Sequence, residues 1–285
     1  MPRRAQIAFR GALAAALALP FVYLAATRVG AVHRLDAAIL SGFANLDRPR
    51  VHDAALAVAR LCDPDRFVWL AAAVIAVALL RRRARSALAV AVVLVGSGLT
   101  TQVLKPALAT PRLSPLLADV GQIAPASWPS GHATASMGLA LCATLAAPPR
   151  VRAWIAALGA VFAVAVTFSF LTLGWHYPSD VLGGFLMASA WTLAAVGVLA
   201  WAGERWPPRA PVGAAPPSLR DALQPAAATA ACGALLTAMV LLARPERTIG
   251  YAAQHTAFVV GAGALAAVAL ALAVGFGLLL RGGRR

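Results

Sequence analysis

The chain has few charged residues for its length, and acidic residues are the scarcest. Charged residues make up 12% of the 285 positions, with 10 acids against 25 lysines and arginines, whereas hydrophobic residues account for 61%. A water-soluble fold cannot bury so much apolar surface, so the composition predicts an integral membrane protein. Long runs of Ala, Leu and Val indicate helices, because a membrane β-barrel would show short alternating segments.

The chain also has only three cysteines. Cys62, Cys142 and Cys232 are odd in number and far apart, which argues against a disulfide framework and a cysteine-based metal site. We interpret all three as small apolar packing residues. The net charge of +15 does not indicate nucleic-acid binding, because the basic residues gather in short clusters between apolar runs and form no face interleaved with aromatic residues.

Eight apolar runs predict membrane spans. The first, taken alone, also fits a secretory signal peptide; we favour a retained helix because the run is long and further spans follow. Two stretches after it, 35–43 and 51–61, show helical spacing and predict amphipathic helices at the membrane surface. The third span is expected to end at Lys105, since Pro106 prevents continuation. The runs cover roughly 8–27, 67–80, 88–104, 133–147, 154–173, 181–202, 226–243 and 256–280.

The basic residues predict the orientation. With both termini cytoplasmic, that side of the cell membrane holds 15 of the 25 basic residues and only two acids, Glu204 and Asp221. This distribution satisfies the positive-inside rule. It places the loops around 105–132 and 174–180 on the extracytoplasmic side.

Proline and alanine dominate residues 203–225, which predicts a cytoplasmic linker. The linker divides a membrane-embedded core over 1–202 from a two-helix C-terminal membrane extension over 226–285. The sequence leaves the role of this extension and the oligomeric state open.

Two outer stretches supply groups that bind phosphate. In Pro129-Ser130-Gly131-His132, Ser130 is a favoured N-cap, and the backbone amides after it form an anion site at the helix start. Gly131 lets a ligand approach the backbone closely. Lys105 and Arg112 add positive charge, and an arginine can hold two phosphate oxygens at once.

A third outer stretch supplies a nucleophile. His176 and Asp180 are four residues apart, so they share one face of a helical turn. The carboxylate can accept the proton of one ring nitrogen and leave the other nitrogen free to attack. Taken singly, each of these residues also has a structural explanation, such as a helix cap or a snorkelling helix end. All six polar residues fall on one predicted face, however, which favours a single site.

The spacing of these residues resembles the type 2 phosphatidic acid phosphatase and vanadium haloperoxidase superfamily. Its motifs are a lysine, six residues and Arg-Pro; then Pro-Ser-Gly-His; then Ser-Arg, five residues, His, three residues and Asp. The chain matches them over roughly 88–202. The matching residues are Lys105, Arg112, Pro129, Ser130, Gly131, His132, Ser169, His176 and Asp180.

The resemblance implies an all-α, multi-pass transmembrane bundle with a six-helix phosphatase-type core, to which this chain adds two C-terminal helices. It implies hydrolysis of a lipid phosphate or polyprenyl diphosphate, of the phosphatidate or undecaprenyl-diphosphate type, without a metal or other cofactor. A lipid head group could reach the outer site while its tails stay in the bilayer. The implied roles are His176 as nucleophile, Asp180 as its orienting partner, His132 as acid, and Lys105, Arg112, Ser130 and Gly131 as phosphate ligands.

Two positions depart from the motifs: Leu113 replaces the proline of the first, and Phe170 replaces the arginine of the third. Losing one donor typically costs ~10²–10³ in rate. Arg66 or Arg244, from outer loops, could substitute. The departure also supports an alternative, a catalytically weak or inactive anionic-lipid binding or transport protein of the same fold. A vanadate-dependent haloperoxidase is disfavoured, because Phe170 would weaken vanadate binding.

Overall fold

A computed structural model describes residues 1–112, 114–118, 123–206 and 218–281, in which all regular structure is helical. This confirms the predicted all-α membrane bundle. The α-helices of this part of the chain are α1 (Arg3–Arg28), α2 (Gly30–Ala44), α3 (Pro49–Ala59), α4 (Pro64–Leu80), α5 (Ala84–Ala107), α6 (Gly131–Ala146), α7 (Arg152–Thr172), α8 (Pro178–Arg205), α9 (Leu219–Ala243), α10 (Pro245–Gln254) and α11 (Thr256–Arg281).

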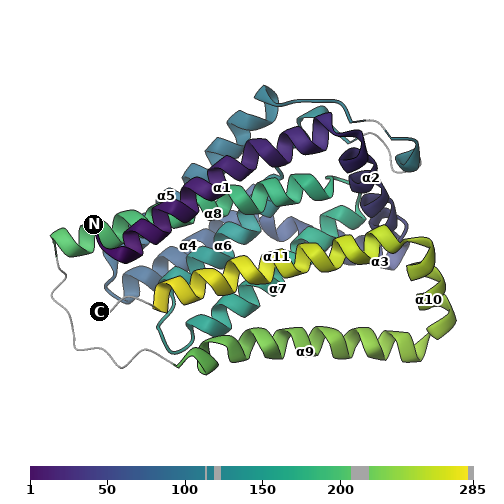
Figure 1. Ribbon diagram of the computed structural model, residues 1–285. Helices are drawn as coiled ribbons and strands as arrows, with labels where there is room; N and C mark the ends of the chain where they lie inside the picture. Colours follow the sequence, from purple (N-terminus) through teal and green to yellow (C-terminus); the bar gives the residue numbers. More distant parts are fainter. Residues whose placement is uncertain (113, 119–122, 207–217, 282–285) are drawn as a thin grey trace.

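The long helices lie side by side, with α2, α3 and α10 at one end of the bundle and the N-terminus and the end of α8 at the other (Figure 1). Helix α1 packs along α8, while α6 packs against α5, α7 and α8. Helix α9 contacts mainly α7 and leaves nearly all its side chains exposed, as expected for a helix surrounded by lipid. The predicted amphipathic stretches form α2 and α3.

Six described helices, α1, α5, α7, α8, α9 and α11, are long and apolar enough to cross a membrane, so two of the eight predicted spans fall short. Helices α4 and α6 have 17 and 16 residues. Most of α6 is buried between neighbouring helices, so its length need not match the bilayer.

Two further predictions differ from the structure in detail. Helix α5 continues through Pro106 to Ala107, because a proline near a helix end removes only one backbone hydrogen bond. Cys62 and Cys142 are buried, but Cys232 is exposed on α9, so it is not a packing residue. Residues 207–217 of the predicted linker, and Leu113, lie outside the described residues, and the division of the chain into core, linker and extension stays a prediction.

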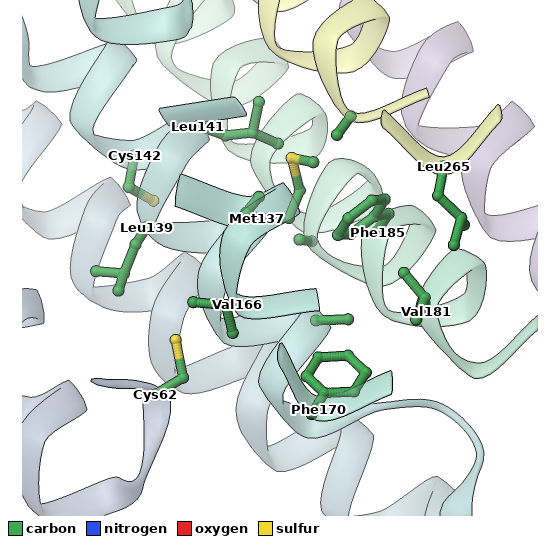
Figure 2. Packing of buried hydrophobic residues seen from close by; sticks show 14 of the residues in the cluster. Cys62, Met137, Leu139, Leu141, Cys142, Val166, Phe170, Val181, Phe185 and Leu265 are labelled. Carbon is green, nitrogen blue, oxygen red and sulfur yellow. The ribbon is translucent and has the colours of Figure 1, made fainter. Parts of the chain in front are cut away.

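The core lies where α6, α7 and α8 meet. Figure 2 shows Met137 of α6 beside Phe185 of α8, with Val166 and Phe170 of α7 below them. All four side chains are almost fully buried and belong to one continuous apolar cluster. This packing fixes the starts of α6 and α8 relative to the end of α7.

A glycine sets how closely α6 and α8 approach. A Cβ atom on Gly184 would lie 2.7 Å from the Ser130 carbonyl oxygen and 2.8 Å from the Thr134 backbone nitrogen. Only glycine fits at this crossing, because both neighbouring atoms belong to the backbone. The first turn of α6 is therefore held directly against α8.

We expect Gly184→Ala to push the start of α6 away from α8 and to cost about 1–3 kcal/mol of stability. Its melting temperature in detergent should fall. Gly98→Ala is the matched control, because no atom lies within 4 Å of that added methyl group, and it should melt at or slightly above the wild-type temperature. Equal melting temperatures for the two variants would contradict this view of the crossing.

Candidate active site

The three polar stretches meet at one end of the bundle, at the end of α5 and the starts of α6 and α8. The backbone amide of Ser130 donates to the Asp180 carbonyl at 3.0 Å, which joins the second and third stretches. The Ser130 hydroxyl accepts from the Ala133 amide at 3.3 Å, so Ser130 is the predicted N-cap. The Lys105 ammonium lies beside Gly131, 3.8 Å from the position a Cβ would take there. A cation therefore faces the amides at the start of α6.

His176 and Asp180 form the predicted pair. The Nδ1 atom of His176 lies 3.3 Å from Oδ2 of Asp180, which also accepts from the Tyr177 amide at 3.0 Å. Asp180 is fully buried, and His176 is 7% exposed. A carboxylate at Nδ1 favours the tautomer that carries its proton there, which leaves the Nε2 lone pair for a reacting group.

Arg112 is placed differently from the sequence expectation. Its guanidinium is buried and donates to Oδ1 of Asp180, to Ser179 Oγ at 3.0 Å and to Ser127 Oγ at 2.8 Å. It also stacks 4.1 Å from the centre of the Tyr177 ring. These contacts show Arg112 holding the start of α8 in place, and its direct binding of phosphate stays a prediction.

Asp36 is a site residue that the sequence reasoning missed. Its carboxylate accepts from the backbone amide of Ser179 at 2.9 Å and from the Ser179 hydroxyl, and lies 3.5 Å from Arg112. Burial raises the Asp36 pKa to about 6; Asp180 adds to the rise, while Ser179 and Arg112 oppose it. The sequence contained a signal for the burial of Asp36, because this residue has helical spacing to the apolar residues Leu40 and Phe43. Both of these residues are buried in the structure.

Asp63 was also missed. Its Oδ1 atom lies 3.0 Å from Nε2 of His132, so the second histidine has a carboxylate partner from the start of α4. The two residues are 69 positions apart, and Asp63 stood among other aspartates of a mixed segment with no local pattern to single it out. Each histidine of the site is thus paired with its own carboxylate.

Phe170, the residue in place of the third-motif arginine, packs against both histidines. Its ring centre lies 5.3 Å from that of His176, edge to face, and 5.9 Å from that of His132. The side chain is fully buried. Both imidazoles therefore border one apolar wall, and this wall offers no hydrogen-bond donor.

Comparison with known proteins found one family match and one similar structure. Residues 86–204, which hold all three polar stretches, match the PAP2 superfamily. This segment is therefore similar to the PAP2 superfamily. A solved structure, described as the first transmembrane PAP2 type phosphatidylglycerolphosphate phosphatase from Bacillus subtilis, shares the fold with a TM-score of 0.55 and 21% identity, over 70% of this chain and 98% of that one. The search of curated proteins gave no match.

Within the residues that the structure describes, no group of three or more His, Cys, Asp or Glu side chains could hold an ion. The cations at the site are instead those of Lys105 and Arg112.

The raised pKa of Asp36 predicts a pH-dependent stability. The folded state holds the proton of the Asp36 carboxyl group more tightly than the unfolded chain, in which the Asp36 pKa is near 3.8. The stability gained from this protonation is therefore complete below about pH 4 and is lost as the pH rises through about 6. The difference corresponds to up to about 3 kcal/mol. Asp36→Asn keeps a neutral group of the same shape, so we expect the wild-type melting temperature to fall relative to this variant between pH 4.5 and 7.5. Parallel curves would contradict the prediction.

Proposed function

We propose that the protein is a membrane lipid phosphatase that works through a phosphohistidine. The observation that carries this proposal is the pair of carboxylate-bound histidines, His176 and His132, that border one wall beside Lys105 and the start of α6. Phosphoryl transfer needs fixed positive charge, a nucleophile and an acid for the leaving oxygen. The site offers one candidate group for each need.

The first half-reaction follows from these contacts. Nε2 of His176 attacks phosphorus, the bond to the lipid oxygen breaks, and His132 gives its proton to that oxygen. Asp180 stabilises the imidazolium ring that results. In the second half, water attacks the phosphohistidine, His132 accepts the proton of the water, and inorganic phosphate leaves.

The phosphate would lie between Lys105 and the amides that begin α6, where the helix dipole also favours an anion. Because Phe170 replaces the third-motif arginine, this phosphate position lacks one hydrogen-bond donor. Of the two candidate replacements, Arg66 is the better placed, because it lies in the first turn of α4, just after the His132 partner Asp63. Arg244 lies at the junction of α9 and α10.

The substrate class follows from where the site lies. It is at one end of a bundle of apolar helices, on the extracytoplasmic side if the arginine clusters face the cytoplasm. A lipid phosphate or polyprenyl diphosphate could bring its head group there from the bilayer. The similar solved structure is described as a phosphatidylglycerolphosphate phosphatase, which supports a lipid phosphate as substrate.

The test is phosphate release by the purified protein from a panel of lipid phosphates and polyprenyl diphosphates, with EDTA present. Wild type should turn over at least one of them, and an alkaline quench should trap phosphate on His176. His176→Ala should lose at least ~10⁴-fold in rate, as expected for a nucleophile. Turnover that survives His176→Ala would contradict the assignment. Tight lipid binding without turnover, even in Phe170→Arg, would favour the alternative of a lipid binder or transporter.

Asp63 gives a second test. If Asp63 orients His132 as the general acid, Asp63→Asn should slow phosphate release from a lipid phosphate by ~10²-fold. The reason is that an alkoxide is a poor leaving group unless it is protonated. Release from p-nitrophenyl phosphate, whose leaving group needs no proton, should change less than ~3-fold. Asp65→Asn, two residues away, is the control. Equal losses on both substrates would show that Asp63 has only a structural role.

A further inference from the structure

A cavity lined by arginines lies at the end of the bundle opposite the candidate active site. The candidate active site is built from the end of α5 and the starts of α6 and α8. This cavity is lined by residues from the starts of α1 and α5 and the ends of α6, α8 and α11. Figure 1 shows the N-terminus and the end of α8 together at that end of the bundle. Its volume is about 660 Å³. Four arginines line it: Arg4, Arg82, Arg83 and Arg85.

The positive charge of this cavity has no counter-charge in the described part of the chain. No acidic side chain belongs to the described lining, and none of the ion pairs among the described residues includes these arginines. The nearest acid in sequence to the lining residue Gly203 is Glu204, which is exposed. Four guanidinium groups around one cavity repel each other, so an anion placed there would relieve that repulsion.

The hydrogen bonds of these arginines reach only neutral groups. Arg83 donates to the Leu145 carbonyl at 3.4 Å and Arg85 to the Trp206 carbonyl at 2.7 Å. The Nε atom of Arg4 is buried and has no hydrogen-bond partner among the described residues. Burial lowers the pKa of the Arg83 guanidinium, and the neighbouring Arg81 lowers it further. Arginines that merely mark a cytoplasmic loop would point into water, whereas Arg4 and Arg83 are half-buried.

Apart from Ser86, the rest of the lining is apolar. Leu145, Val196 and Leu199, from α6 and α8, supply an apolar wall of the cavity. A guanidinium fork matches phosphate oxygens, and basic pockets between membrane helices suit anionic head groups. The apolar wall would suit the first methylene groups of an acyl chain. A free phosphate would use the arginines but leave this wall uncovered.

We infer that this arginine cavity binds the phosphate head group of an anionic membrane lipid. The lipid joins helices from the beginning, middle and end of the chain, so its binding stabilises the bundle. This inference does not depend on the proposed function, because the cavity and the histidines lie at opposite ends of the same helices.

The experiment uses the full chain in neutral detergent with phosphatidylglycerol, a phosphodiester that lacks the terminal phosphate of a phosphatase substrate. Wild type should show a higher melting temperature and retain the lipid in native mass spectrometry. Arg4→Gln with Arg83→Gln should weaken lipid binding roughly 10- to 30-fold. The matched control is Arg3→Gln with Arg81→Gln, which removes the same charge next to the cavity but outside its lining, and it should bind like wild type.

Ala200→Glu gives a second test that does not depend on whether the double arginine variants fold. It places a carboxylate among the arginines, so it should fold, melt at a higher temperature than wild type without lipid, and lose the lipid effect. Equal losses in the two double variants would overturn the inference, as would equal stabilisation by phosphatidylcholine. Stabilisation by inorganic phosphate equal to that by phosphatidylglycerol would overturn the assignment to a lipid.

Discussion

A single buried carboxylate, that of Asp180, joins the parts of the site. It contacts His176, Arg112 and the Tyr177 amide, while the backbone carbonyl of the same residue accepts from Ser130. A carboxylate without solvent is tolerated only when its oxygens are paired. Here a guanidinium and the imidazole Nδ1 lie at its two oxygens. The arrangement that stabilises this charge is therefore the same one that orients His176, the proposed nucleophile.

The apolar bundle makes this arrangement possible. The start of α6 lies directly against α8 at Gly184, and Phe170 packs against both histidines. Asp36, from a helix outside the matched family region, holds the Ser179 amide at the start of α8. The site thus depends on α2 as well as on the motif-bearing helices. Arginines gather at the opposite end, which is consistent with one end facing outward for chemistry and the other facing the cytoplasm.

Much of the fold and part of the site could be predicted from the sequence, because the sequence patterns that specify them are local. Hydrophobic runs predicted the long helices, Ser130 was recognisable as a cap, and the four-residue spacing of His176 and Asp180 predicted their contact. The sequence could not show that Asp36 and Asp63 join the site, since their partners lie 143 and 69 positions away. It also could not show that Arg112 would be held by carboxylates. Six of the eight expected spans are long enough to cross a membrane, whereas α4 and α6 are shorter. Hydrophobic runs alone could not show this, because a buried helix such as α6 need not match the bilayer.

The central claim is that His176 faces a phosphate position formed by Lys105 and the start of α6. Its most direct test is an experimental structure of the protein with orthovanadate, an analogue of the phosphoryl group in transfer. We predict vanadium bonded to Nε2 of His176, with its oxygens at Lys105 and the Gly131 amide and with His132 on the leaving-group side. Vanadate bound elsewhere, or bonded to His132 with His176 turned away, would contradict it.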